Sequence, residues 1–92
     1  MHRLGPLKQH YWNLLNMLRA TGADAVSAFD DGALSSEDWA EMVAQCRGCH
    51  WTKGCKAFLA QQANARQTVP APDHCRNRAK VNALRALFLK VA

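Results

Sequence analysis

Four cysteines constrain the fold of this chain more than any other feature of its 92-residue sequence. They are Cys46, Cys49, Cys55 and Cys75, and their spacing is C-x2-C-x5-C-x19-C. A chain this short buries only a modest share of its surface on folding, so a bound metal or two disulfides would add appreciably to its stability. Because three cysteines fall within residues 46–55, the pattern favours one shared centre over four unlinked core cysteines. We expect Gly48 and Gly54 to let this segment turn so that its sulfurs face one point.

The remaining sequence has the apolar spacing of amphipathic helices and no alternating apolar–polar stretch that predicts a strand. The expected helices cover about residues 6–20, 25–30, 36–46, 55–63 and 74–92. A polar linker with Pro70 and Pro72 precedes the last helix, and Cys75 is expected at the start of that helix. The sequence therefore predicts one all-α domain over residues 1–92, with four or five short helices around one four-cysteine site.

Two of the expected helices begin with capping signals. Ser35 followed by Asp38 predicts a capping box, and Leu34 with Trp39 is placed to form a hydrophobic staple. Thr21, followed three residues later by Asp24, is the expected cap of the short helix over residues 25–30.

The net charge of +5 is distributed unevenly along the chain. Residues 23–45 carry six acids and no lysine or arginine, whereas residues 46–92 carry nine lysines and arginines against one acid. Much of this basic excess adjoins the cysteines, which indicates compensation of an anionic centre or docking of an acidic protein partner. The bases of the last expected helix spread around its axis, so we expect only weak, non-specific binding to nucleic acid.

The compartment bears on what the cysteines do. No apolar run of signal-peptide length is visible, and none approaches the roughly 18 residues of a membrane span. We therefore expect a cytoplasmic protein with no membrane contact. In a reducing cytoplasm, clustered cysteines bind metal or do redox chemistry more often than they form disulfides.

Four chemistries fit the cysteines. An iron–sulfur cluster takes four cysteine ligands at varied spacings, and we expect a 4Fe–4S more than a 2Fe–2S cluster. Zinc also accepts four cysteines, but its structural sites more often pair two C-x2-C knuckles, and the second is missing here. Two disulfides are the third possibility. The fourth is a c-type haem, because the run from Cys46 to His50 matches C-x-x-C-H, with His50 as axial ligand.

The run of three cysteines resembles the iron–sulfur loop of the endonuclease III family of DNA glycosylases. That resemblance covers Cys46, Cys49 and Cys55 and implies a four-iron cluster on a helical domain, without the glycosylase activity. The chain as a whole resembles a group of small uncharacterised bacterial proteins, over about residues 15–80. The residues that carry this second resemblance are Leu34 to Trp39, Cys46 to Cys49, Cys55, Phe58-Leu59 and Cys75 to Asn77. It implies a helical fold and a shared cysteine site, and no known activity.

Other candidate residues are fewer. His10, His50 and His74 are possible metal ligands, and His50 and His74, which each adjoin a cysteine, could substitute for one cysteine ligand. Trp51 is placed to shield a cluster from water. No hydrolytic constellation, phosphate loop or dinucleotide fingerprint is present, so we expect no independent enzyme activity. The sequence thus predicts a small iron–sulfur protein that transfers electrons or reports redox or iron state to a partner. A zinc-stabilised module that contacts an acidic protein or nucleic acid is the alternative, followed by a disulfide-stapled or haem-bearing periplasmic protein.

Overall fold

The computed structural model describes residues 6–89, and the regular structure in that range is entirely helical. The helices are α1 (Leu7–Thr21), α2 (Ala25–Asp30), α3 (Ser36–Arg47), α4 (Thr52–Gln62) and α5 (Arg78–Leu89). This confirms the predicted all-α fold and the number of helices. Residues 1–5 and 90–92, which fall in or beside the first and last expected helices, lie outside the described residues.

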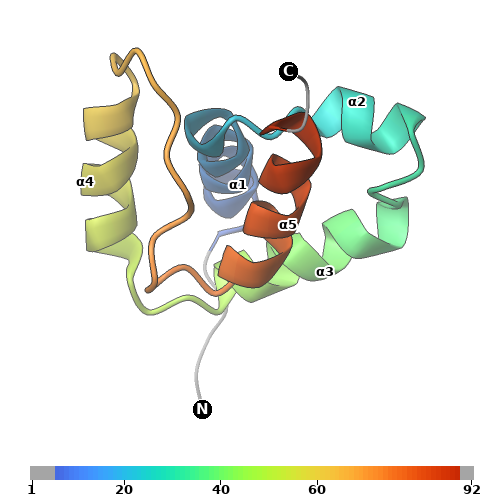
Figure 1. Cartoon of the computed structure of the whole chain (residues 1–92). Coiled ribbons are helices and arrows are strands. Elements are labelled where there is room, and N and C mark those ends of the chain that lie inside the picture. The colour runs from blue at the N-terminus through green and yellow to red at the C-terminus, as the bar shows by residue number, and fades with distance from the viewer. Residues whose placement is uncertain (1–5, 90–92) are drawn as a thin grey trace.

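Helix α1 lies at the centre of the fold and packs against α3, α4 and α5 (Figure 1). Its face toward the other helices carries Leu14, Met17 and Leu18, each at most 2% exposed. The helix ends at Gly22, whose φ of 81° is a left-handed conformation that glycine adopts without strain. The N–H of Ala23 then reaches back to the carbonyl of Leu18 at 2.9 Å, as in a Schellman motif. This tight ending lets the chain turn directly into α2.

The caps of α2 and α3 test the sequence predictions. The expected cap at Thr21 is wrong, because Thr21 is the last residue of α1 and its hydroxyl donates to the carbonyls of Met17 and Leu18. Asp24 caps α2 instead, by accepting the N–H of Ser27 at 3.2 Å. The capping box of α3 is confirmed, with Ser35 accepting from Asp38 and Asp38 accepting from Ser35.

The starts of the last two helices differ from the expected positions. Helix α4 begins at Thr52, three residues before the expected start at Cys55, so Gly54 is a helical residue. Helix α5 begins at Arg78, so Cys75 lies in a series of turns before the helix and not at its head. In those turns the N–H of Cys75 donates to the carbonyl of Pro72 at 3.0 Å. The polar linker is therefore longer than the sequence indicated.

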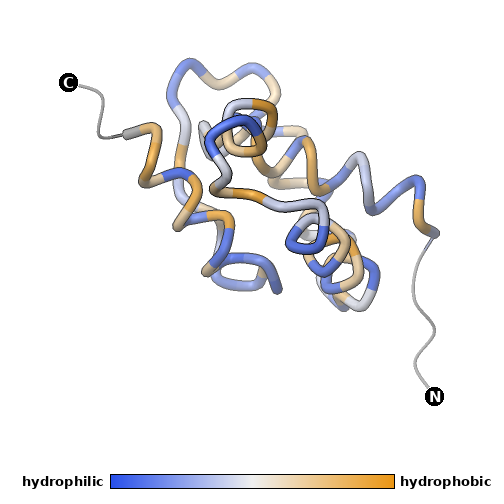
Figure 2. The backbone as a smooth tube through the Cα atoms, turned by 90° about the vertical axis from the view of Figure 1, so that its right-hand side faces the viewer, coloured by the Kyte–Doolittle hydropathy of each residue, from blue (hydrophilic) through white to orange (hydrophobic). Residues whose placement is uncertain are grey.

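The core is formed by small and medium apolar side chains from all the helices except α4. Its buried members are Leu14, Met17, Leu18, Ala23, Ala28, Leu34, Met42, Val43, Ala71, Val81 and Leu84. Helix α4 contributes the half-buried Phe58 and Leu59, and Cys46, Cys55 and Cys75 pack against the same cluster. Hydrophobic and hydrophilic stretches alternate along the helices (Figure 2), as amphipathic helices require. Within residues 6–89, no helix has the length and apolar character needed to cross a membrane.

Candidate metal centre

All four cysteines line one small internal cavity between α1, α3, α4 and the loop before α5. Cys46 lies in the last turn of α3, Cys49 in the turn that follows, Cys55 in α4 and Cys75 in the last loop. The cavity has a volume of about 20 Å³, which is room for about one water molecule. Its other walls are Asn13, Leu14, Met17, Trp51, Arg76 and Asn77. The fold therefore brings the predicted residues together from three separate segments.

Two polar contacts fix the loop of Cys75 against the end of α3. Arg76 donates from Nη1 to the carbonyl of Gly48 at 2.9 Å. The buried Asn77 donates from Nδ2 to the carbonyl of Met42 at 2.8 Å. These contacts place Cys75 beside the turn that carries Cys49.

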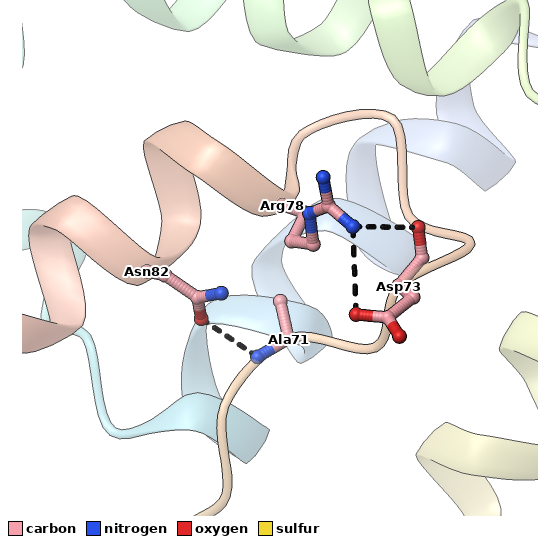
Figure 3. Close-up of polar contacts among 4 residues, drawn as sticks. All are labelled: Ala71, Asp73, Arg78 and Asn82. Carbon is pink, nitrogen blue, oxygen red and sulfur yellow. Dashed lines mark hydrogen bonds and ion pairs between the residues drawn. The ribbon is translucent and has the colours of Figure 1, made fainter.

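The other side of the same loop is tied to α5 (Figure 3). The N–H of Ala71 donates to Oδ1 of Asn82 at 2.7 Å, and Arg78 forms an ion pair with Asp73 at 3.4 Å. The ion pair is solvent-exposed and adds little stability by itself, but the hydrogen bond to Ala71 is partly buried. The loop is thus held at both ends, and Cys75 sits between the two attachments.

The two glycines of the cysteine segment act by close approach instead of by special backbone conformation. Gly48 has a φ of −87°, which any residue adopts. A Cβ there would lie 2.7 Å from Nη1 of Arg76, the same group that binds the Gly48 carbonyl. At Gly54, a Cβ would occupy the space of the Trp51 indole ring. The expectation that these glycines are needed to turn the chain is therefore wrong. Glycine is required because the side chains of Arg76 and Trp51 pack directly against these two positions.

Trp51 covers one side of the cavity, as the sequence predicts for a shielding residue. Its ring stacks on that of His74, with the ring centroids 5.2 Å apart and the planes 24° from parallel. Its backbone N–H donates to the Cys49 sulfur at 3.3 Å.

The four thiols interact electrostatically in every pairwise combination. Burial, followed by the neighbouring cysteines, raises the pKa of Cys46 to about 12 and that of Cys55 to about 11. Burial also raises the pKa of Cys75, although the N–H of Asn77 acts in the opposite direction. In the metal-free protein these three thiols are therefore protonated at neutral pH, because burial, followed by the neighbouring thiols, disfavours the thiolate form.

His10 is a neighbour of the site that the sequence singled out only as one of three histidines. It is 5% exposed, and its Nδ1 lies 3.5 Å from the Cys46 sulfur, which is also 3.5 Å from the His10 carbonyl oxygen. Burial and the positive charges of Arg47 and Lys56 lower the pKa of His10. His74 stacks on Trp51, and His50 is exposed. His10 is therefore in contact with a cysteine sulfur of the site.

The structure has the four cysteines as free thiols. Among residues 6–89, no three histidine, cysteine or acidic side chains form a group that could hold a metal ion as they stand. The cysteines surround a shared space without meeting at one point.

One comparison with known proteins gives a match. A family model described as "Family of unknown function (DUF6455)" matches residues 1–87. The chain belongs to this family. No curated protein and no solved structure matches it.

Membership confirms the resemblance to a group of uncharacterised proteins, and the match extends beyond the residues 15–80 on which the resemblance was based. The family description assigns no activity, cofactor or partner. Any function must therefore be argued from the residues of the site.

Proposed function

We propose that this domain binds an iron–sulfur cluster of the 4Fe–4S type through Cys46, Cys49, Cys55 and Cys75. The observation that carries the proposal is that all four sulfur-bearing side chains line one cavity. Four cysteines are the ordinary ligand set of such a cluster, and their spacing in the chain varies widely among cluster proteins. The likeness of the first three to the endonuclease III loop supports the same assignment.

The spacing of the cysteines favours a cluster over a single zinc ion. Structural zinc sites more often pair two C-x2-C knuckles, and this chain has one such knuckle, Cys46 and Cys49. Cluster proteins use more varied spacings.

Charge supplies a second argument. Burial, followed by the neighbouring cysteines, raises the pKa values of Cys46 and Cys55 and so disfavours their thiolate form. Bound iron ions would supply positive charge beside these sulfurs and release the protons, since metal binding requires deprotonated ligands. Arg76 lines the cavity, and the charges of Arg47 and Lys56 act on the adjoining His10, so the surroundings already favour an anionic centre.

The proposed role is electron transfer, or a redox- or iron-responsive contact with another protein in the cytoplasm. Arg47, Lys56 and Arg76 near the centre would suit an acidic partner surface. We include in the proposal that the domain has no independent enzymatic activity and binds nucleic acid only weakly.

Anaerobic purification, followed by a visible spectrum and analysis of iron and sulfide, tests the proposal. We expect a brown protein with about four iron and four sulfide per chain. Replacing any one of the four cysteines by serine should lower both contents, and the melting temperature should fall with them because cofactor binding contributes folding energy.

The His50→Ala variant is the matched control. It removes the axial ligand that a c-type haem would need and should leave the iron and sulfide contents unchanged. A colourless protein with one tightly bound zinc would refute the cluster and support the zinc alternative. A protein with no metal under any condition would refute both.

A further inference from the structure

Four aromatic rings form a continuous strip across α1, α3 and α2. Trp12 contacts Tyr11 with ring centroids 5.8 Å apart, and Tyr11 contacts Trp39 at 5.6 Å. Trp39 then contacts Phe29 at 6.4 Å. Trp12 is 50% exposed, and Tyr11 and Phe29 are also classed as exposed. A run of touching, half-exposed rings is unusual on a protein that has no partner.

A groove of about 480 Å³ between α1 and α3 continues this aromatic strip. The lining residues of the groove are Leu7, Lys8, Tyr11, Trp39, Ala40, Val43, Ala44 and Arg47. Its floor is almost entirely apolar, and the two exposed alanines of α3 leave room for close approach. Strip and groove together offer on the order of 400 Å² of apolar surface, since an aromatic side chain carries about 150–250 Å² and these are roughly half exposed.

The two ends of this surface carry opposite charge. Lys8 and Arg47 line the groove at the end formed by the start of α1 and the end of α3. Glu37 lies in the first turn of α3, and Asp30 ends α2 beside Phe29. Helix α2 and the start of α3 lie at one end of the molecule, away from the end of α3 (Figure 1). The surface therefore runs from a basic end to an acidic end.

We propose that this aromatic strip and groove bind a second copy of the same chain in a two-fold symmetric dimer. A two-fold axis through the middle of the surface brings this surface of one copy against the same surface of the other, running in the opposite direction. The basic end of each copy then lies against the acidic end of the other. An interface of ordinary size buries about 800 Å² per partner, somewhat more than half of it apolar, which is close to what the strip and groove supply.

The charge pattern is the reason to choose a second copy over another occupant. An acidic helix would be attracted at the Lys8 end and repelled at the Glu37 end. A basic helix would be repelled at the Lys8 end and attracted at the Glu37 end. A second copy related by two-fold symmetry gains attraction at both ends. This proposal does not depend on the identity of the centre held by the cysteines.

Sedimentation equilibrium of the purified full-length protein across micromolar to millimolar concentrations tests the dimer. We expect a concentration-dependent shift toward twice the 10.2 kDa mass of the chain. The Trp12→Ser variant should raise the dissociation constant by about 30-fold, the effect expected for truncating an interface tryptophan that carries much of the binding energy. Its far-ultraviolet circular dichroism should not change, because the ring is half exposed.

Leu87→Ser is the matched control. Leu87 is 47% exposed on α5, outside the strip and groove, and its replacement should leave the dissociation constant unchanged. A wild-type protein that stays monomeric throughout the concentration range would overturn the proposal. So would a Trp12→Ser protein that dimerises as tightly as wild type.

Charge reversal tests the arrangement of the two copies. Lys8→Glu and Glu37→Lys should each weaken the dimer by about 5- to 10-fold at low salt, because each replaces an attraction by a repulsion. The double variant restores opposite charges at the two ends and should recover most of the wild-type affinity. A double variant weaker than both single variants would rule out the two-fold arrangement.

Discussion

Replacing Gly54 by alanine should destabilise the protein, although the substitution improves the intrinsic propensity of helix α4. An alanine in a helix interior is favoured over glycine by about 1 kcal/mol. At this position, however, the added Cβ would occupy the space of the Trp51 indole ring. Because the indole ring is a rigid plane, it cannot bend around the added Cβ and must move off its stack on His74.

The magnitude follows from what Trp51 loses when it moves. Loss of an aromatic stack costs about 1 kcal/mol. Re-exposure of roughly 80 Å² of the ring costs about 2 kcal/mol at 25 cal/mol per Å². Against the gain in helix propensity, the net effect is a loss of about 2 kcal/mol. For a domain of this size that corresponds to a melting temperature lower by about 8–15 °C.

Thermal unfolding of metal-free protein under reducing conditions measures the effect, with Ala57→Gly as the calibrating control. Ala57 is exposed on the same helix, so its replacement by glycine reports propensity alone and should cost about 1 kcal/mol. Gly54→Ala should also let an alkylating reagent reach the cysteines faster, because Trp51 forms a wall of their cavity. A Gly54→Ala protein that is more stable than wild type, by about what Ala57→Gly loses, would refute the reasoning.

The remaining predictions concern the core, a cap, the thiols and the charge. Leu14→Ala should lower the free energy of unfolding by about 2–5 kcal/mol in urea titrations, because the side chain is fully buried and lines the cysteine cavity. Ser35→Ala should cost about 1 kcal/mol by loss of the capping box, measured by thermal melts. Metal-free protein should lose stability as the pH rises from about 9 toward 12. The raised pKa values of Cys46 and Cys55 mean that the folded state keeps protons that the unfolded state releases in this range. Urea titrations at pH 8 and pH 10.5 measure this, and equal stabilities at the two pH values would contradict it. Binding to a DNA duplex should be weak and should fall steeply between two salt concentrations, and tight, sequence-dependent binding at physiological salt would contradict it.

The fold could be predicted from the sequence wherever the signal is local. The start of α3 is specified by Ser35 and Asp38 within one helical turn, and both hydrogen bonds form as expected. The start of α5 could not be predicted in this way. Pro72-Asp73 has the composition of a helix start, but Arg76 and Asn77 are held in turns by carbonyls of Gly48 and Met42. Contacts with residues distant in sequence decide the conformation there, and local propensity gives way to them.

The candidate site shows the same division. The cysteine spacing predicted which four residues would share a cavity, because clustering is visible in one dimension. The contact between His10 and Cys46 spans 36 positions in the sequence, and nothing in the composition near His10 indicates it. The reason for Gly54 was likewise hidden, because it depends on where the ring of Trp51 lies. Side-chain orientation across helices is a property of packing, which a single sequence does not display.

The groups that hold the Cys75 loop are synthesised after the first three cysteines, so the four-cysteine site is completed late in translation. During translation, Cys46, Cys49 and Cys55 leave the ribosome first, while Cys75 and the groups that hold its loop, Arg76 and Asn82, are still to be made. A chain that stops early would display three cysteines but lack both the fourth and the strap that presents it. Under the proposed function, such a truncated chain would lack one of the four ligands and should retain the cofactor less well than the finished chain.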